Sequence, residues 1–534
     1  MRNKDPFFQD YLTLSTIEQA AKAEGRLLLY CGAGVTIDRT GHSWGSLILS
    51  LLPERKHRSR PDMPTRTQVG FLNSRSPESL ASSVVYLLRA NSGGGERLQR
   101  TLRDRLRAAL YQDEGRWENG RLVEEIITLA AMRSHLGRET MILTTNYDTY
   151  LEQAYDRIRG NIPDVVSFPG LRVHRAGLAS PVRIEPPNKT DPDEPGSYVD
   201  IVYLHGRLPP TGRGKVSWPL ILDENSYAQS AGVVEKTIED ALKDASLAFL
   251  LGTSLSDTPL IRALSASSGE GCERLGVLLR ADFAHNDAAD EGLALTLARY
   301  RASELGVGLL FPDFPGQVAQ LIHEVVLRQV FDVARPDEPQ SLPYTDRVDA
   351  WWANWSARAG TDPHLTQRLR QMLAHAYEIT RLSPAGSPMD TARERLLVEL
   401  WVREGPVATK RSLRRWGRSS DVLPDGLAGK SADLERGSYL APIRAFVDGR
   451  PRLLDVKDLD GGRHDLTQYT WKSFLCVPVF VHGAVVGVIS LASTRRVQNC
   501  AMNADSETTA SLVSRLRLEG TALLAVDAPV EATA

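Results

Sequence analysis

The sequence has few cysteines, and those it has lie far apart. Only four occur among 534 residues, and no two of them form a C-x-x-C pair: Cys31, Cys272, Cys476 and Cys500. Closely spaced cysteines are typical of structural zinc sites and of the disulfide frameworks of small secreted domains. We therefore expect free thiols in a reducing cytoplasm, and no cysteine zinc site.

Long apolar runs and an excess of one charge are missing as well. The longest apolar stretches, VPVFV and GAVVGVISLA, are interrupted and fall short of the roughly 20 residues that a membrane span requires. The first residues, MRNKDPFFQDYL, contain no apolar segment of a secretory signal. The formal net charge is -2, so no global field attracts nucleic acid or an anionic membrane. We expect a cytoplasmic protein that binds no membrane. No direct contact with nucleic acid is evident, although the net charge leaves a local basic patch open.

What the sequence does contain is an apolar run that ends in a glycine turn. Residues 26–36 read RLLLYCGAGVT, in which the run is followed by Gly32, Ala33 and Gly34. This pattern is typical of a buried parallel strand that ends in a tight turn into a helix. Glycine lacks a Cβ, so a diphosphate can approach the main chain there, and the next helix N-terminus favours negative charge. A strand-to-helix turn without a ligand fits the same residues equally well.

Polar residues follow three further apolar runs in the same way. The runs are MILTT (141–145) before Asn146 and Asp148, IVYL (201–204) before His205, and LAFLL (247–251) before Gly252, Thr253 and Ser254. With short apolar runs at 276–279 and 307–311, at least six strands alternate with helical segments, which predicts a parallel sheet with helices on both faces. Groups at the carboxyl ends of such strands face a ligand crevice.

Each of these residues also has a structural interpretation. Asn146 or Asp148 can cap the helix that follows, and a lone His-Gly pair is more often structural than catalytic. In favour of His205, an imidazole pKa near neutrality suits proton transfer. Two other stretches are expectations about the fold alone: a long surface loop at 165–195 and a strand at 217–222.

The last third of the chain shows a different pattern. Residues 336–343 (PDEPQSLP) predict a linker, and the helices that follow carry Trp351, Trp352 and Trp355, which suit a partner surface or, in our interpretation, packing between domains. Two apolar runs joined by His482-Gly483 predict an antiparallel hairpin over 474–491, and a helix is expected at about 505–525. Since the chain is too long for one ordinary core, we expect domains at 1–335 and 393–534, with a linker and helical connector at 336–392.

Taken in order, the motifs resemble a known family. GAG (32–34), TNYD (145–148), LHG (204–206) and GTSL (252–255) resemble the sirtuin NAD-binding fold, most closely the sirtuin-like domains of bacterial antiphage defence proteins. The hairpin, with GLAGK (426–430) and the closing helix, resembles a GAF domain. The expected fold class is therefore α/β, with a Rossmann-like doubly wound parallel sheet, followed by a smaller α+β GAF-like domain with an antiparallel sheet.

The resemblance implies NAD+ as the substrate and gives each motif a role. Asn146 would face the nicotinamide ribose and position the attacking water, and His205 would be the acid–base group near the ribose hydroxyls. The other residues would bind NAD+: Gly32, Ala33, Gly34 and Thr36 at the diphosphate, Asp148 in support of the Asn146 loop, and Gly252, Thr253 and Ser254 at the adenosine half. The roles of Asp38, His42 and Asp257 stay open.

Two departures from the sirtuin deacylases matter. Residues 207–251 contain no cysteine, where those enzymes usually carry a four-cysteine zinc module, and GHSWG (41–45) stands where they tend to have GIPDFR. The resemblance thus implies a zinc-free NAD+ hydrolase, a homo-oligomer regulated by a small-molecule or phage-derived activator at its C-terminal domain. The alternatives are a non-catalytic NAD or ADP-ribose sensor, an ADP-ribosyltransferase and a zinc-free deacylase. For the C-terminal domain, a structural role in dimerisation competes with ligand sensing.

Overall fold

The computed structural model divides the chain into two compact units. It describes residues 5–53, 65–69, 77–92, 95–111, 119–162, 168–177, 182–184, 198–210, 218–269, 271–283, 288–334, 342–359, 364–382, 394–404, 411–419, 431–435, 437–460 and 470–525. The sheet unit comprises Gln19–Glu114 and Leu122–Pro312, and the C-terminal unit comprises Met1–Glu18, Gly115–Arg121 and Asp313–Ala534. The boundaries expected at residues 335 and 392 stay predictions.

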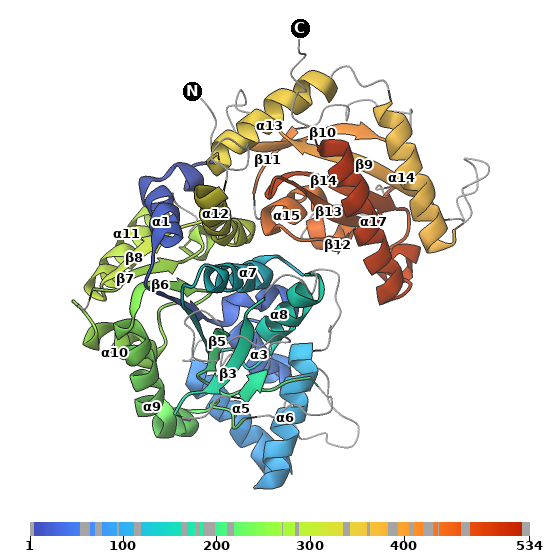
Figure 1. Ribbon diagram of the computed structural model, residues 1–534. Coiled ribbons are helices and arrows are strands. Elements are labelled where there is room, and N and C mark those ends of the chain that lie inside the picture. Colours follow the sequence, from blue (N-terminus) through green and yellow to red (C-terminus); the bar gives the residue numbers. More distant parts are fainter. Residues whose placement is uncertain are drawn as a thin grey trace. The chain divides into compact units, whose positions relative to one another are not determined.

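The sheet unit is built around a twisted, mostly parallel sheet (Figure 1). Its described strands are β1 (Arg26–Cys31), β2 (Thr140–Thr144), β3 (Gly170–Arg175), β4 (Val182–Ile184), β5 (Tyr198–Tyr203), β6 (Ala245–Leu251), β7 (Glu273–Val277) and β8 (Val307–Leu310). Their order is β4-β3-β5-β2-β1-β6-β7-β8, and only the β3–β4 pair is antiparallel. The predicted α/β parallel sheet is confirmed.

Helices connect the strands and bury the sheet. In the described part of this unit they are α2 (Ile37–Thr40), α3 (Trp44–Ser50), α4 (Arg66–Val69), α5 (Pro77–Ser92), α6 (Glu96–Tyr111), α7 (Leu122–His135), α8 (Tyr150–Gly160), α9 (Glu224–Lys243), α10 (Thr258–Ala266) and α11 (Ala288–Glu304). Leu28 and Tyr30 of β1 pack with residues of α9, α10 and α11 in one buried cluster. Because side chains alternate along a strand, Leu27 and Leu29, which are fully buried too, serve the opposite face.

Two expectations about this unit were wrong. Residues 170–175 and 182–184 form β3 and β4 instead of belonging to one long loop. In β3, buried Leu171 and Val173 alternate with half-buried Arg172 and His174, the period of a strand, which the surrounding prolines obscure. The described residues 218–222 form no strand, because Ile221 donates to the carbonyl of His205 instead of joining the sheet.

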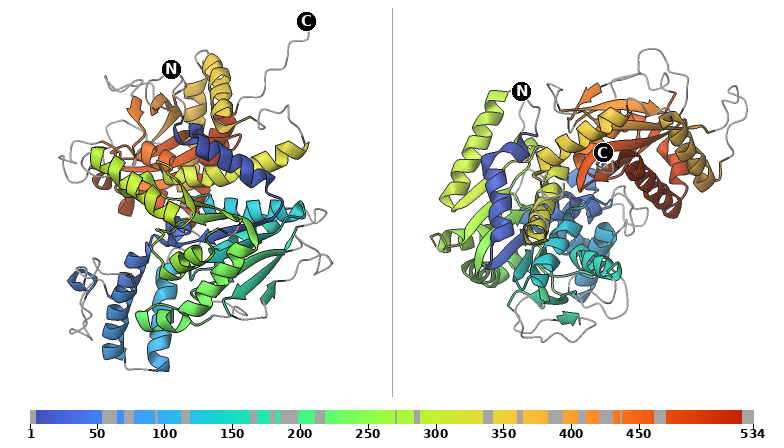
Figure 2. Two further views of the ribbon diagram at one scale, coloured as in Figure 1. Left: turned by 90° about the vertical axis from the view of Figure 1, so that its left-hand side faces the viewer. Right: turned by 45° about the horizontal axis from the view of Figure 1, so that its top comes forward.

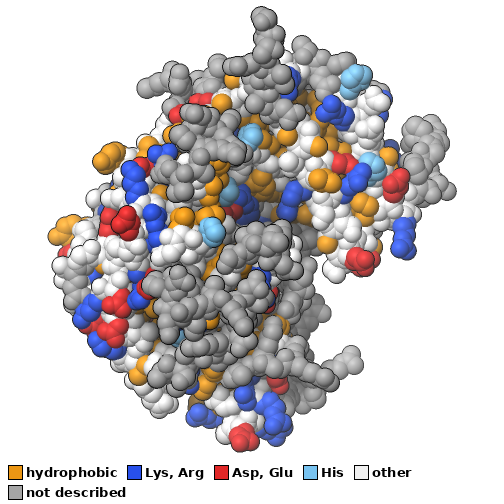
Figure 3. All heavy atoms as spheres, viewed as in Figure 1, with side chains coloured by type: hydrophobic (Ala, Val, Ile, Leu, Met, Phe, Trp, Pro, Cys, Tyr) orange, Lys and Arg blue, Asp and Glu red, His pale blue; other side chains and the backbone are white. Residues whose placement is uncertain are grey.

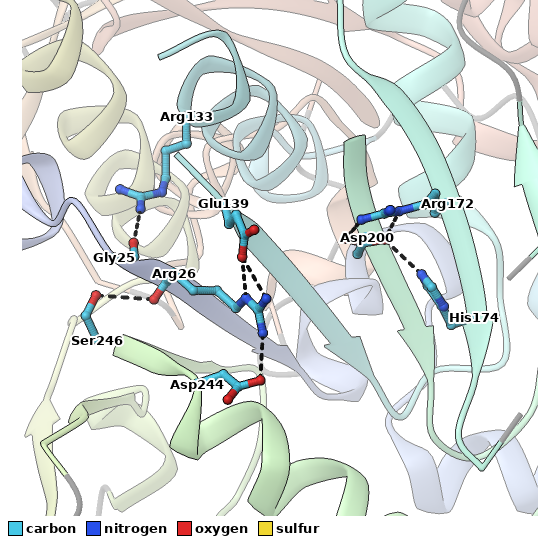
Figure 4. A network of polar contacts seen from close by, with 9 residues as sticks. All are labelled: Gly25, Arg26, Arg133, Glu139, Arg172, His174, Asp200, Asp244 and Ser246. Atoms are coloured by element: carbon cyan, nitrogen blue, oxygen red, sulfur yellow. Dashed lines mark hydrogen bonds and ion pairs between the residues drawn. The ribbon is translucent and has the colours of Figure 1, made fainter. Parts of the chain in front are cut away.

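Ion pairs fasten the edge of the sheet at which β1, β2 and β6 begin (Figure 4). Arg26, the first residue of β1, bonds Glu139 at 2.8 Å and Asp244 at 3.0 Å, the residues just before β2 and β6.

A second polar network joins β5 to β3. Asp200 of β5 accepts from Arg172 at 2.6 Å and lies 2.8 Å from His174, both on β3. Burial opposes ionisation of Asp200, but the bonds from His174 and Arg172 outweigh it and keep the pKa of this carboxyl below its usual value.

The C-terminal unit contains an antiparallel sheet of order β11-β10-β9-β14-β13-β12 in its described residues. The strands are β9 (Leu396–Arg403), β10 (Ser412–Arg418), β11 (Ser431–Asp433), β12 (Arg452–Asp455), β13 (Ser473–Val481) and β14 (Ala484–Ser493). The predicted hairpin is β13–β14, and its turn residues His482 and Gly483 both have positive φ, 47° and 79°, as a two-residue hairpin turn requires. The GLAGK stretch lies outside the described residues.

Helices cover this second sheet (Figure 2). Those described are α12 (Pro315–Ala334), α13 (Tyr344–Ala359), α14 (Leu365–Thr380), α15 (Ala441–Asp448), α16 (Val456–Asp460) and α17 (Ser506–Leu524), and the N-terminal α1 (Tyr11–Lys22) starts in this unit. Trp351, Trp352 and Trp355 of α13 pack with one another, and the last two also contact Trp416 of β10. The tryptophans therefore serve internal packing of this unit.

The surface agrees with the near-neutral composition. On the face drawn in Figure 3, acidic and basic side chains of the described residues are interspersed. None of the helices within the described ranges has both the length and the apolar character that crossing a membrane takes.

Candidate active site

The four loops singled out in the sequence leave one edge of the parallel sheet. They follow β5, β2, β1 and β6, which are consecutive neighbours and run parallel, so their carboxyl ends lie side by side. Backbone hydrogen bonds tie the loops together as they leave the strands: Leu204 N to Thr144 O at 2.8 Å, Thr145 N to Cys31 O at 3.1 Å and Gly32 N to Leu251 O at 2.8 Å. The sheet thus brings the predicted site residues to one edge.

The glycines of this edge are required by packing between two loops. A Cβ on Gly34 would lie 2.8 Å from the Cα of Gly252. Gly252 itself has φ of +62°, and a Cβ on it would lie 2.5 Å from the amide nitrogen of Val35. The amides of Gly32, Gly34 and Thr36 already donate to backbone carbonyls. The glycines therefore let the β1 and β6 loops touch, which is a structural reason for the pattern, while diphosphate binding by this turn stays a prediction.

Asn146, Thr36 and Asp148 form a buried hydrogen-bonded triad. The Asn146 Nδ2 donates to Gly32 O at 3.1 Å and to Thr36 Oγ1 at 3.3 Å, and Thr36 Oγ1 donates to Asp148 Oδ2 at 2.9 Å. Since a carbonyl can only accept, the bond to Gly32 fixes which amide atom is Nδ2. Asn146 does not cap the next helix, whereas Asp148 Oδ1 accepts from the Tyr150 amide of α8 at 3.1 Å, so its capping interpretation holds in part.

Burial sets the charge state of Asp148. Its side chain is among the buried polar groups, with 4% exposure. Desolvation raises its pKa to about 6, against the hydrogen bonds from Thr36 and the Tyr150 amide and the charge of Arg39, which lower it. Asp148 is therefore mostly ionised at pH 7 and readily protonated below pH 6.

His205 differs from the expected neutral-pH acid–base group. It is 3% exposed, and burial lowers its pKa to about 4, so the imidazole is uncharged at pH 7. Its Nδ1 lies 3.2 Å from the hydroxyl of Tyr227 on α9, and its Nε2 is buried without a hydrogen-bond partner in the described part of the chain. A neutral imidazole of this kind can accept or donate a hydrogen bond through Nε2, but it is no general acid at pH 7.

Tyr227 was not predicted as a site residue, and its hydroxyl is the described hydrogen-bond partner of His205 Nδ1. Its ring meets the imidazole edge-on, with ring centroids 5.0 Å apart. Burial raises the pKa of Tyr227, so the phenol is neutral and can either donate to or accept from Nδ1. The proton on the imidazole thus lies on Nε2 in the first case and on Nδ1 in the second. In the sequence, the sign of this role is its position: Tyr227 lies in the first turn of α9, the helix between β5 and β6, and both of these strands end in motif residues.

The loop after β6 contains a residue with positive φ, and one of its carboxylates accepts a hydrogen bond from a tyrosine of β1. Leu255 has φ of 54°, which a leucine rarely adopts, and such strain often accompanies function. Ser254 on one side of it is exposed and lies 2.5 Å, oxygen to oxygen, from Ser256. Asp257 accepts from the Tyr30 hydroxyl at 3.0 Å, and burial raises its pKa despite that bond.

A cavity next to Asn146 joins residues that the motifs did not connect. Its volume is about 20 Å³, room for about one water molecule. Its walls include Thr36, His42, Trp44, Asn146, Tyr147 and Asp148. His205 and the loop after β6 do not line it, but Tyr147 donates to the carbonyl of Ile221 at 2.6 Å, and the Ile221 amide donates to His205 O at 2.8 Å. The structure therefore places His42 beside Asn146.

Two family models match parts of the chain. Residues 140–289 match the model of the SIR2-like domain, and residues 394–516 match the model of the GAF domain. No curated protein matches the sequence. A solved structure of a type II free methionine-R-sulfoxide reductase from Thermoplasma acidophilum matches with 18% identity, 30% of this chain and 94% of that chain covered, and a TM-score of 0.20. The chain thus carries a SIR2-like domain, whose family binds NAD, and a C-terminal GAF domain, a type that typically binds small-molecule ligands.

Proposed function

We propose that this chain hydrolyses NAD+ to nicotinamide and ADP-ribose, as a regulated effector of antiphage defence that depletes NAD. The observation that carries the proposal is the site at the carboxyl edge of the sheet, where Asn146 adjoins a cavity for one water within a SIR2-like domain. SIR2-like domains act on NAD, and a water is the second reactant of a hydrolysis. The division into domains at 1–335, 336–392 and 393–534, and assembly as a homo-oligomer, belong to the same proposal.

Asn146 is the group that would hold the attacking water. Both protons of its amide end face fixed acceptors, Gly32 O and Thr36 Oγ1. No described residue donates to its Oδ1, so this atom remains able to accept a hydrogen bond from water. A water oriented in this way needs no strong base, since nicotinamide leaves readily and positioning supplies much of the rate.

Asp148 and His205 would serve charge and orientation. Hydrolysis passes through an oxocarbenium-like state, so a carboxylate that is ionised at pH 7, as Asp148 is, favours it electrostatically. The uncharged imidazole of His205 would contact a ribose hydroxyl through Nε2, the atom without a partner among the described residues. Gly32, Ala33, Gly34, Thr36, Gly252, Thr253 and Ser254 would line the path of the dinucleotide. The residues at the edge therefore suit NAD+ chemically.

The space at this site indicates a closed state. A cavity of about 20 Å³ holds a water but not a nicotinamide riboside, and the Nε2 atom of His205 is covered. Among the described residues, the space beside Asn146 and His205 is therefore too small for NAD+ as it stands. We infer that opening is the regulated step, and that a small-molecule or phage-derived activator acting through the GAF domain promotes it.

Chromatography of the products tests the proposal. Purified full-length protein is incubated with NAD+, alone and with candidate activators, beside Asn146→Ala and the control Asn91→Ala. Asn91 is an asparagine of α5 whose Nδ2 donates to Leu87 O of the same helix at 2.9 Å. We expect nicotinamide and ADP-ribose to form with wild type and control, and removal of the water-positioning amide to slow this by about 100-fold or more. Label from NAD+ appearing on protein, or deacylated peptide, would replace hydrolysis by the corresponding transfer. Tight NAD+ binding with no product in any condition would indicate a sensor.

A further inference from the structure

A second and much larger cavity lies in the C-terminal unit. It has a volume of about 280 Å³ and is bounded by the first residues of the chain, α1, α12 and the start of α13. Its walls are mostly apolar and include Phe8, Leu14, Ile17, Leu327, Leu342 and Tyr344. Leu14 and Leu342 are also 41% and 40% exposed, so the cavity opens to the surface and a small molecule can enter it from solvent. Concave, mostly apolar spaces of this kind are where small molecules bind.

The charged side chains of the cavity wall form two ion pairs. Arg347 binds both carboxylate oxygens of Glu324, one of them at 2.9 Å, and the two side chains are 3% and 6% exposed. Nearer the surface, Arg328 Nε bonds Glu18 Oε2 at 3.1 Å. Both pairs line the cavity, so its wall carries two cations and two anions. A charged ligand that took Arg347 or Glu324 from its partner would leave the other charge buried and uncompensated, which is strongly unfavourable.

The same contacts keep the cavity formed without a ligand. Arg347 of α13 donates to Leu342 O at 2.8 Å as well as to Glu324 of α12, and Gln320 donates to Glu324 at 2.6 Å. These bonds join the start of α13 to α12 through buried charges. The space between them is therefore a preformed pocket, only slightly smaller than the roughly 300–1,000 Å³ of typical ligand sites.

We propose that this cavity is a binding site for an uncharged, mainly apolar small molecule. Its lining residues lie outside residues 140–289 and 394–516, so the site is separate from the SIR2-like match and from the GAF match. The volume fits a molecule of one or two rings, and the paired charges select against acids and amines. The inference does not depend on NAD+ hydrolysis.

A fluorescent ligand tests this directly with the full-length protein. The probe is prodan, an uncharged naphthyl ketone whose emission shifts to the blue in apolar surroundings. Leu14→Trp enlarges a side chain that lines the cavity and is 41% exposed, and Leu12→Trp makes the same change on the same helix at a leucine that is 36% exposed and does not line it. We expect saturable binding to wild type, weakened at least about tenfold by Leu14→Trp and unchanged by Leu12→Trp.

Charge selectivity and folding complete the test. The anionic probe 1-anilinonaphthalene-8-sulfonate should displace prodan at least about tenfold more weakly than a neutral naphthalene does. Unfolding midpoints of the variants show whether α1 is intact, and Leu327→Trp fills the cavity from α12 should Leu14→Trp destabilise the fold. Prodan that does not saturate, that binds both tryptophan variants alike, or that stays bound when Leu327→Trp fills the space would overturn the proposal. Displacement by the anion as readily as by naphthalene would overturn the selectivity.

Discussion

Replacing Asp148 by asparagine should make the sheet unit more stable above pH 6. Asp148 is 4% exposed, and its pKa is raised from 3.8 to about 6 by burial. A difference of about two pH units at about 1.4 kcal/mol each corresponds to about 3 kcal/mol. This much of the free energy of unfolding is present while both states are protonated, below about pH 4, and is lost as the pH rises through 6, where the folded protein must carry the buried charge.

Asparagine has the shape of the protonated carboxyl and never ionises. It can still accept from the Tyr150 amide, as Asp148 does at 3.1 Å. We therefore expect Asp148→Asn to equal the wild type near pH 4 and to exceed it by about 3 kcal/mol at pH 7.5. A stabilised variant that has lost activity would identify Asp148 as a residue kept for function at the expense of stability.

The measurement must report on the sheet unit alone, since the chain contains two units. Hydrogen exchange of the β2 amides between pH 4 and 7.5 gives the free energy of opening for that strand. The control is Asp156→Asn, a change on the exposed side of the same helix α8. Wild type and Asp148→Asn with the same pH dependence would refute the reasoning, as would a pH-dependent gain of equal size in Asp156→Asn.

Three further changes probe the site and its support. Tyr227→Phe removes the hydrogen-bond partner of His205 Nδ1, which should lower the free energy of unfolding by about 1 kcal/mol and leave the protein folded. The ¹⁵N signals of the imidazole should then report a changed tautomer, and NAD+ cleavage should slow. Unchanged signals would mean that the hydroxyl does not orient the ring. Gly34→Ala places a Cβ 2.8 Å from the backbone of Gly252 and should lower the free energy of unfolding by more than about 2 kcal/mol. Gly232→Ala, at an exposed helical position with nothing within 4 Å, should raise it by up to about 1 kcal/mol. Equal shifts of the thermal midpoint would contradict the packing explanation. On α8, Glu152 accepts from Arg207 at 2.6 Å, and the two side chains are 7% and 9% exposed. Glu152→Gln leaves the buried guanidinium of Arg207 without its carboxylate and should cost about 3–5 kcal/mol in urea unfolding; a loss below about 1 kcal/mol would show that the pair is solvated.

The sequence predicted the strands best where one apolar run meets one turn. Residues 247–251 became the core of β6, because a central parallel strand is buried on both faces and reads as unbroken apolar sequence. The strand β3 was missed because it lies next to the edge and alternates: Arg172 and His174 point away from the core and are matched by Asp200, a partner 26 or more residues away. Pairing at that distance leaves no local signal.

The site shows the same division between motif and environment. Strand ends predicted that Asn146 and His205 would lie at one edge, since that follows from topology alone. Burial of His205 and its bond to Tyr227 depend on the packing of α9, which has no local signal in the sequence. For this reason the sequence suggested an imidazole pKa near neutrality, whereas burial lowers it to about 4. Likewise, the glycines at 32 and 34 signalled a close approach, but the closest atoms belong to Gly252.

Hydrolysis of etheno-NAD+, followed by its rise in fluorescence, tests the central claim most directly. Wild type, Asn146→Ala, His205→Ala and the outlying Asn91→Ala are compared across the same set of candidate activators. We expect some condition to give a rise with wild type and Asn91→Ala, about 100-fold slower in Asn146→Ala and clearly slower in His205→Ala. A rise of the same rate in all four proteins, or none in any condition with the cavity shown to be open, would contradict it.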